Sequence, residues 1–185
     1  MTADTTDCDG WFDIGPTDGI VSVADSLAVD FETAATCTLT VTSLSDDGST
    51  STASFDVQIT DYDEFDVTQP VDDNDDDNEI PEDATAGTSA NITASSSDAD
   101  GTTNAVTYSI VSQTCNGAFS VDSSSGDVTV ASPSAIDYEV ATTCSIAIRA
   151  TSADGSTADS TFVVEITDVN DCLLYTSPSP RDSNL

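Results

Sequence analysis

Acidic side chains recur along this chain in pairs separated by a single residue. The pairs are Asp30 and Glu32, Asp61 and Asp63, Asp98 and Asp100, and Asp137 and Glu139. Two further groups of oxygen-bearing side chains are Glu82 with Asp83, and Asp168 with Asn170 and Asp171. This spacing lets two carboxylates converge on one ion from an extended or turning chain. Calcium takes about six to eight oxygen ligands from such groups. The chain has no His, the commonest transition-metal ligand, so the pattern favours calcium.

The pairs recur because the chain contains the same passage twice. Residues 8–64 align without a gap on residues 115–171 at a constant offset of 107, with 23 identities in 57 positions. The period is longer than that of solenoid repeats, whose units reach roughly 50 residues. It predicts a tandem array of small complete domains. A single active site would not recur with the repeat, which disfavours an enzyme. Paired carboxylates of a glycoside hydrolase are the enzymatic alternative, but aromatic residues for a sugar platform are few.

Short alternating strands must position these carboxylates. In Ser160–Asp168 the apolar residues Phe162, Val164 and Ile166 fall on one face. Further strands are expected at 88–94, 105–111, 127–130 and 144–151, with a hairpin at Asp154-Gly155. The first copy repeats the pattern with Leu39, Val41, Phe55, Val57 and Ile59. Six or seven short strands in about 90 residues predict an all-β protein of Greek-key β-sandwich repeats.

Four cysteines occupy equivalent positions in the two copies of the repeat. Cys8 and Cys37 are 29 positions apart, and so are Cys115 and Cys144. Two disulfides would indicate an oxidising compartment, and each would stabilise its domain by roughly 3–4 kcal/mol in the chain-entropy model. Two pairs of buried thiols are the alternative. No CxxC motif is present, so a zinc or redox site is disfavoured.

The charge balance limits the partners. The chain has 35 acidic and two basic residues, and its formal net charge is −33. Such a chain is a very poor partner for nucleic acid or for an anionic membrane surface. No apolar run reaches about 18 residues, so no membrane insertion of this segment is expected. The charge favours cations, and the competing explanation is an adaptation for solubility or high salt.

Residues 80–171 resemble a cadherin repeat, and residues 8–64 resemble the C-terminal part of a preceding one. The residues that carry the resemblance are Pro81-Glu82-Asp83 with Gly87-Thr88, Asp98-Ala99-Asp100, Val106–Ile110, Phe119–Asp122, Ile136-Asp137-Tyr138-Glu139 and Asp168-Val169-Asn170-Asp171. The resemblance implies calcium ions clamped between successive repeats. It departs from the family at Ser152, where an Asp is common, and at Asp61–Glu64, which lacks Asn.

The resemblance implies two ligand sets. The upper set is Asp30, Glu32, Asp61, Asp63, Asp98 and Asp100, and the lower set is Glu82, Asp137, Glu139, Asp168, Asn170 and Asp171. The upper set lacks a Glu from the start of the first repeat, and the lower set lacks the DxD of a following one. We therefore expect weaker calcium binding here than in a longer array. Trp11 is expected in the core, so no Trp-exchange arm is seen, and homophilic adhesion follows from the resemblance alone.

The expected organisation is a truncated repeat at 1–64, an acidic linker at 65–79, a complete repeat at 80–171 and a non-native tail at 172–185. The tail resembles a translated sequencing adapter, with an ordinary Ser/Pro linker as the alternative. The acidic run 72–78 is expected to be a solvated loop, and Asn91-Ile92-Thr93 is a glycosylation sequon on a predicted strand. The leading function is a calcium-binding extracellular adhesion module whose neighbours are other repeats. The alternative is a stalk repeat of a large surface or secreted protein, such as a bacterial-type adhesin.

Overall fold

The computed structural model describes residues 2–5 and 8–170. Asp171 and the predicted tail at 172–185 lie outside the described residues. The described residues divide into two compact units. Unit 1 comprises residues 2–5, 8–68, 96–106 and 151–158, and unit 2 comprises residues 69–95, 107–150 and 159–170. Unit 1 therefore combines the first copy of the repeat with two loops that belong to the second copy in sequence.

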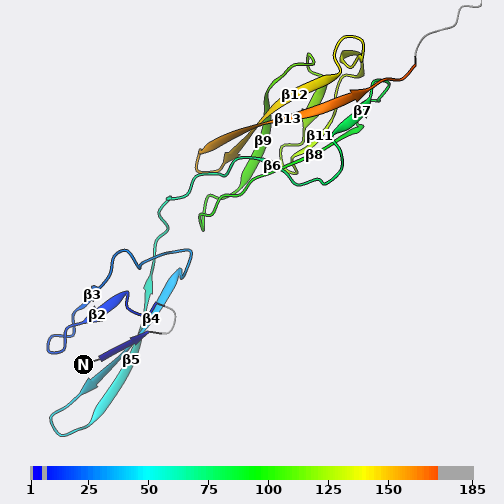
Figure 1. Ribbon diagram of the computed structural model, residues 1–185. Helices are drawn as coiled ribbons and strands as arrows, with labels where there is room; N and C mark the ends of the chain where they lie inside the picture. Colours follow the sequence, from blue (N-terminus) through cyan, green and yellow to red (C-terminus); the bar gives the residue numbers. More distant parts are fainter. Residues whose placement is uncertain (1, 6–7, 171–185) are drawn as a thin grey trace, which may run out of the picture. The chain divides into compact units, whose positions relative to one another are not determined.

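Two four-stranded sheets organise unit 2 (Figure 1). One sheet has the order β10 (Phe119–Val121), β11 (Asp127–Val130), β8 (Ser89–Ser95) and β6 (Val71–Asp72). The other has the order β7 (Glu79–Pro81), β13 (Thr157–Thr167), β12 (Thr143–Ser152) and β9 (Val106–Gln113). A short 3-10 helix, η1, spans Pro133–Ala135. The predicted β-sandwich is therefore present, and β6 and the start of β7 come from the segment expected to be a linker.

The core of unit 2 lies between these sheets. Along β12 the residues alternate, and Ile146, Ile148 and Ala150 are buried while Arg149 faces outward. Val164 and Ile166 of β13 are buried beside them, as the alternating pattern predicts. A disulfide joins Cys115 to Cys144 at the start of β12. The second copy of the repeat therefore contains the predicted disulfide, and not a pair of buried thiols.

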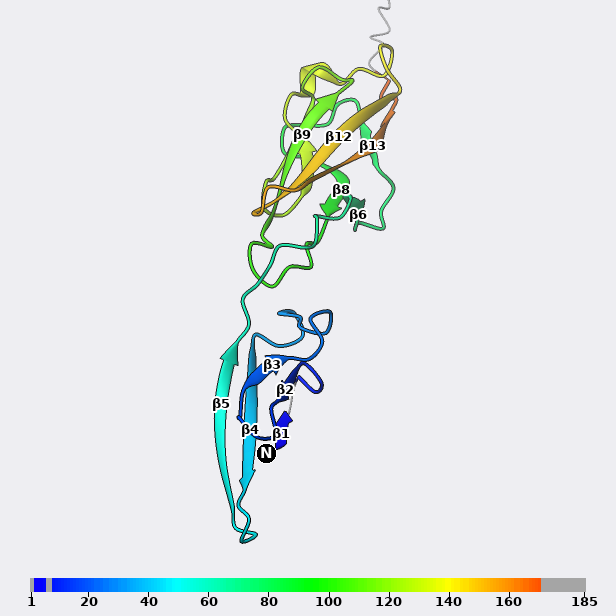
Figure 2. The same ribbon diagram turned by 90° about the vertical axis from the view of Figure 1, so that its left-hand side faces the viewer.

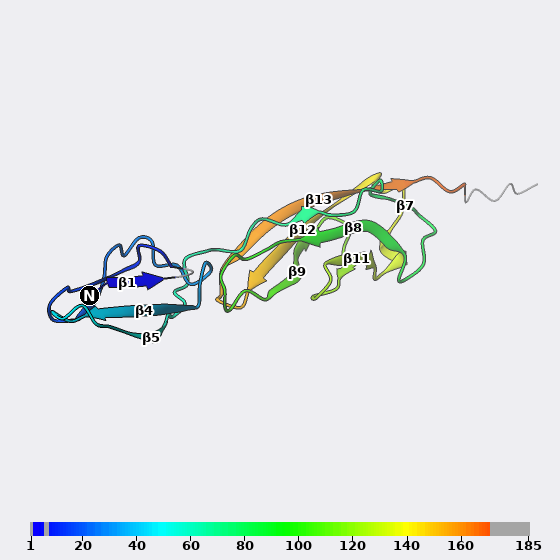
Figure 3. The ribbon, with the colours of Figure 1, turned by 90° about the horizontal axis from the view of Figure 1, so that it is seen from below.

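Strand β7 closes the second sheet by a parallel pairing. Ile80 is paired in register with Ile166 of β13, and Ile80 is buried. Figure 3 shows β7 beside the end of β13. Asn91 in β8 has a positive φ of 56°, and the register between β8 and β11 shifts between Asp127 and Thr129. The irregularity therefore coincides with the sequon, which lies on a strand as expected.

Unit 1 contains five strands that repeat part of this arrangement (Figure 2). A three-stranded sheet has the order β1 (Thr2–Thr5), β4 (Thr36–Leu44) and β5 (Thr50–Gln58), and β2 (Phe12–Ile14) pairs with β3 (Val21–Val23). Shifted by the offset of 107, β2 coincides with β10, and β4 and β5 coincide with β12 and β13 apart from their last residues. The described part of unit 1 has no counterparts of β6, β7 and β8.

The core of unit 1 is built around a second disulfide. Cys8 and Cys37 are bonded, and they form a buried cluster with Trp11 and Leu39. Trp11 is only 5% exposed, so the expectation that it belongs to the core is confirmed. Both predicted cysteine pairs are therefore disulfides.

One apolar face of unit 1 departs from the sequence expectation. Phe55 was expected to share an inward face with Val57, but its side chain is 57% exposed. It lines an apolar pocket of about 410 Å³ together with Val21, Leu39 and Val41. The counterparts of Leu39 and Val41 in unit 2 are Ile146 and Ile148, which lie inside a complete sandwich and are fully buried. Without counterparts of β6–β8, the same inward-facing pattern is left partly exposed.

Candidate metal centre

Three groups of carboxylates gather within unit 1. They are Asp30 with Glu32 and Glu64, Glu32 with Asp61 and Asp100, and Asp63 with Asp100 and Asp154. Within each group, one oxygen from each residue lies within 4.8 Å of the others. Glu32 belongs to the first and second groups, and Asp100 belongs to the second and third. The three groups are therefore linked in a row by two shared carboxylates.

Asp100 is the most buried member of the row. Its side chain is 1% exposed, and one oxygen, Oδ2, is buried without a hydrogen-bond partner. The other oxygen, Oδ1, accepts hydrogen bonds of 3.3 Å from the backbone amides of Glu64 and Phe65. A buried carboxylate oxygen without a partner is costly. A cation at this position would satisfy it.

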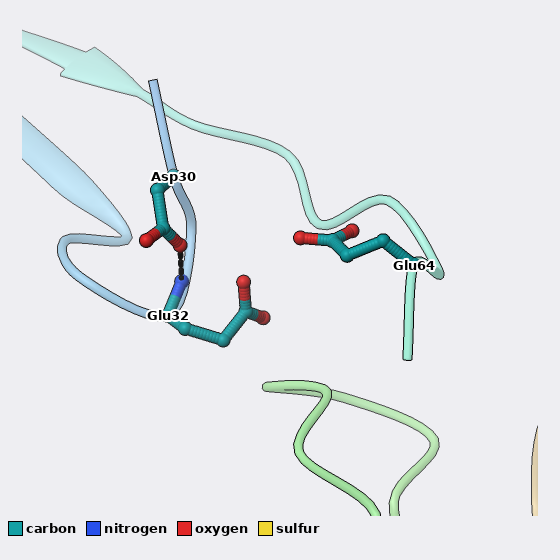
Figure 4. Close-up of side chains that lie close together, drawn as sticks. All are labelled: Asp30, Glu32 and Glu64. Atoms are coloured by element: carbon teal, nitrogen blue, oxygen red, sulfur yellow. Dashed lines mark hydrogen bonds between the residues drawn. The ribbon is translucent and has the colours of Figure 1, made fainter. Parts of the chain in front are cut away.

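The first group combines the segment before β4 with the segment after β5. Asp30 Oδ1 accepts a hydrogen bond of 2.9 Å from the Glu32 amide, which fixes the local turn. Figure 4 shows the Glu32 and Glu64 carboxylates pointing toward one another across the space between their segments. No hydrogen bond is drawn between the Glu32 and Glu64 carboxylates in Figure 4. Both groups are oxygen ligands of like charge, so a cation that binds oxygen suits the space between them.

The loop at 96–106 contacts the carboxylates of the first copy. Glu32 Oε1 accepts a 2.8 Å hydrogen bond from the Gly101 amide, and Asp61 Oδ2 accepts hydrogen bonds from both the amide and the hydroxyl of Thr102. A Cβ added to Gly101 would lie 2.6 Å from Cε1 of Phe31. Glycine is therefore required for the close approach of this loop.

Partial desolvation and the neighbouring negative charges raise the pKa values of two carboxylates in the row. Partial desolvation, followed by the nearby charges of Asp154 and Asp100, raises the pKa of Asp63 above its ordinary value. Desolvation, followed by the charge of Glu32, raises the pKa of Glu64 in the same way. Both shifts mean that an additional positive charge in this row would be favourable.

Basic side chains do not neutralise these groups in the described part of the chain. Arg149 is the one Lys or Arg there, and it forms a salt bridge with Asp159, with Nε and Oδ1 separated by 2.7 Å. Arg181, the other basic residue, lies outside the described residues. Among the described residues, therefore, no Lys or Arg side chain supplies a counter-charge to the carboxylate row.

Unit 2 holds a single group of this kind. Glu82, Glu139 and Asp168 each place an oxygen within 4.8 Å of the others. Glu82 accepts hydrogen bonds from the amides of Tyr138 (2.9 Å) and Val169 (2.8 Å), which lower its pKa and hold the carboxylate in its charged form. Glu82 and Glu139 also line an open pocket of about 290 Å³. This group is smaller than the row in unit 1, and none of its members is as buried as Asp100.

Most of the predicted ligand residues fall in these groups. In the upper set all but Asp98 belong to a group, and Asp98 lies beside them, where its Oδ1 accepts the amide of Asp100. In the lower set Asp137 belongs to no group, although it lines the same pocket as Glu82. Asn170 is exposed, and Asp171 lies outside the described residues.

Sequence reasoning missed two members of the row, Glu64 and Asp154. The repeat could have revealed Glu64, because the offset of 107 places it at Asp171, which was among the predicted ligands. Asp154 was interpreted only as part of a hairpin turn. Its proximity to Asp63 depends on how the β12–β13 hairpin folds back, and no spacing in the sequence indicates it.

The acidic run at 72–78 forms local turns rather than a carboxylate group. Asp72 Oδ1 accepts the amide of Asn74, and Asn74 Oδ1 accepts the amide of Asp76. Asn78 donates its side-chain amide to Asp72 Oδ2 at 2.9 Å. The run therefore connects β6 to β7, with several of its polar groups satisfied within the run itself.

Comparisons with known proteins agree with this geometry. Residues 77–167 match the family model of the cadherin domain. Among solved structures, three domains (EC21-23) of human CDH23 are 25% identical with a TM-score of 0.72, covering 88% of this chain and 52% of that chain. Chicken VE-cadherin EC1-2 is 24% identical with a TM-score of 0.64, covering 90% and 83%. Protocadherin gammaB7 EC3-6, a cis-dimer structure, is 21% identical with a TM-score of 0.69, covering 96% and 44%.

The chain thus spans about half or less of the length of two of these three structures. No curated protein matches the sequence. The described residues also contain no helix with the length and apolar character needed to cross a membrane. Cadherin domains are adhesion modules and not enzymes, in agreement with the expectation from the repeated carboxylates. On the family match and the fold together, residues 77–167 are a cadherin domain.

Proposed function

We propose that this chain is a calcium-binding extracellular module whose carboxylate row in unit 1 holds calcium ions. The observation that carries the proposal is the state of Asp100. Its Oδ2 is buried without a partner in a protein whose net charge is −33. Calcium suits a site of this kind because it is a hard cation that takes several carboxylate oxygens in flexible geometry.

The linkage of the three groups supports a row of up to three ions. Glu32 and Asp100 each belong to two groups, so each can bridge neighbouring ions. Ions bound in this way would tie the segment after β5 to the loop at 96–106, because Asp61, Asp63 and Glu64 lie in the first and Asp100 lies in the second. Calcium would therefore stiffen the connection within unit 1. In the lower set, Glu82, Glu139 and Asp168 would supply a further, weaker site.

An extracellular location is supported by the two disulfides, since disulfides persist in oxidising compartments. The solved structures that resemble the chain include extracellular cadherin domains. We propose that the module acts in cell adhesion and lies next to other repeats of the same kind. The resemblance to cadherins further implies homophilic contact and membrane anchoring of a longer protein. A stalk repeat, in which calcium only provides rigidity, is the second candidate.

Calorimetric titration of the chain with calcium tests the binding claim. We expect binding that magnesium does not reproduce, because magnesium demands near-octahedral geometry and dehydrates reluctantly. Asp100→Asn should weaken binding strongly, whereas Asp46→Asn, an exposed position in the β4–β5 hairpin, should leave it unchanged. Equal affinity of the Asp100→Asn variant and the native chain would refute the proposed centre.

A further inference from the structure

The hairpin between β12 and β13 contributes a carboxylate to the row. Asp154 lies in this hairpin, and one of its oxygens lies within 4.8 Å of oxygens from Asp63 and Asp100. The resemblance to cadherin repeats suggested an Asp two positions earlier, where this chain has Ser152. Ser152 is buried, and its hydroxyl donates a 3.0 Å hydrogen bond to the carbonyl of Thr103. Ser152 is therefore engaged with the backbone and brings no negative charge to the row.

The hairpin holds Asp154 in a defined position. The amide of Ser156 donates a 2.7 Å hydrogen bond to Asp154 Oδ1, and the amide of Ser152 donates a 3.0 Å hydrogen bond to the carbonyl of Ser156. The hydroxyl of Ser156 in turn accepts a 2.9 Å hydrogen bond from the amide of Val67. The tip of the hairpin is thus tied to the segment that follows β5, where Asp63 lies.

We propose that Asp154 is a ligand of a calcium ion shared with Asp63 and Asp100, and that it supplies the charge that Ser152 lacks. The inference rests on the proposed calcium-binding function. Its independent support is the unpartnered Oδ2 of Asp100, which is 1% exposed and belongs to the same group. Three carboxylates at such short separation repel one another unless a cation lies between them.

The repeat supplies a matched control. Asp47 occupies the equivalent position in the β4–β5 hairpin, in the same Asp-Gly-Ser-Thr sequence, and its Oδ1 accepts the amide of Ser49 at 2.9 Å. Asp47 belongs to none of the carboxylate groups found among the described residues. Asp47→Asn and Asp154→Asn therefore make the same chemical change in the same turn, and only the second removes a carboxylate from the row. Asn keeps the Oδ1 acceptor that the turn needs.

Calcium titration of the full chain and the two variants tests the inference. We expect Asp154→Asn to weaken one class of calcium site by about tenfold or more, because affinity follows the number of charged ligands, while Asp47→Asn binds as the native chain does. Unchanged affinity in Asp154→Asn, with the native chain binding calcium, overturns this inference and leaves the proposed function intact. Absence of calcium binding in the native chain overturns both.

A second variant separates ligation from folding. Asp154→Glu keeps the carboxylate and should bind calcium more tightly than Asp154→Asn. In chelator, Asp154→Asn should melt at or above the temperature of the native chain, because one repelling charge has been removed. Two results together would mean that Asp154 has only a structural role and that the inference is wrong. In chelator, Asp154→Asn would melt at a lower temperature than the native chain, and Asp154→Glu would bind calcium no more tightly than Asp154→Asn.

Discussion

Glu32 and Gly101 are 69 positions apart, and a 2.8 Å hydrogen bond from the Gly101 amide to Glu32 Oε1 joins them. Glu32 lies just before β4, and Gly101 lies in the loop at 96–106. Glu32 also contributes a carboxylate oxygen to two of the three groups in the row. The same residue therefore positions a backbone loop and contributes to the row of carboxylates, which couples the shape of the loop to the state of the row.

Substitution of Gly101 should disturb this coupling by steric means. In Gly101→Ala the new Cβ would lie 2.6 Å from Phe31 Cε1 and 2.9 Å from Glu32 Oε1. We expect a loss of about 1–3 kcal/mol of folding free energy, typical of overpacking, together with weaker calcium binding. Urea unfolding followed by the fluorescence of Trp11, the single Trp, reports on unit 1. Ala99→Ser, at an exposed site in the same loop, is the control, and equal stability of Gly101→Ala and this control would contradict the steric account.

The disulfide of unit 1 should carry much of that unit's stability. Cys8→Ser with Cys37→Ser removes a crosslink of 29 positions, buried against Trp11 and Leu39. We expect a loss of roughly 3–4 kcal/mol in the chain-entropy model, with measured values ranging from about 0 to 5. The Trp11 unfolding transition in denaturant measures it.

The second copy provides the control for this experiment. Cys115→Ser with Cys144→Ser removes an equally spaced disulfide from unit 2. This variant should shift the Trp11 transition less, because Trp11 lies in unit 1. An equal shift from both double variants would mean that the two units unfold as one.

The metal-free chain should become more stable as the pH falls from neutral toward the carboxyl range. The pKa values of Asp63 and Glu64 are raised above their ordinary values of 3.8 and 4.5. Groups with raised pKa values contribute stability that is complete below the ordinary pKa and lost as the pH rises through the folded one. Asp30 has a lowered pKa, chiefly through the Thr33 hydroxyl, so its contribution is lost only as the pH falls below 3.8.

Melting in chelator at several pH values measures this effect. The melting temperature should rise as the pH is lowered toward 4.5, and calcium at neutral pH should reduce the dependence by holding Asp63 and Glu64 in the charged form. A melting temperature that falls steadily from neutral pH downward would contradict the repulsion inferred within the row.

Two classes of calcium site should be distinguishable. The row in unit 1 has three linked groups and the buried Asp100, whereas unit 2 has one group made of Glu82, Glu139 and Asp168. We expect Asp100→Asn to weaken the tighter class and Glu139→Gln to weaken the looser class, with little effect of either on the other. Calorimetric titration resolves the classes. Loss of both classes in Glu139→Gln would show that the sites are not independent.

Much of the fold follows from local pattern, because alternation along β12 and β13 fixes which residues face the core. Phe55 shows where this reasoning stops. Its place on the inward face was correct by pattern, but burial also needs a complete opposing layer, and the described part of unit 1 has only β2 and β3 there. Patterns along one strand carry no information about the presence of another strand.

The carboxylate row also combines residues that the sequence pattern predicts with a residue that only the tertiary structure reveals. Asp30, Glu32, Asp61, Asp63 and Asp100 could be named from their spacing and the resemblance, and the repeat offset could have added Glu64. Asp154 could not be predicted, since its position depends on the hydrogen bonds of Ser156 to the hairpin and to Val67. Such contacts between distant segments are fixed by the tertiary structure.

Thermal unfolding of the chain with millimolar calcium and with chelator, followed by Trp11 fluorescence, tests the central claim most directly. A ligand that binds the folded state alone stabilises it by about 2.7 kcal/mol at a concentration one hundred times its Kd. We predict a higher melting temperature in calcium than in chelator, and no comparable rise in magnesium. The same melting temperature in calcium and chelator would contradict a calcium centre in the row of Asp30, Glu32, Asp61, Asp63, Glu64, Asp100 and Asp154.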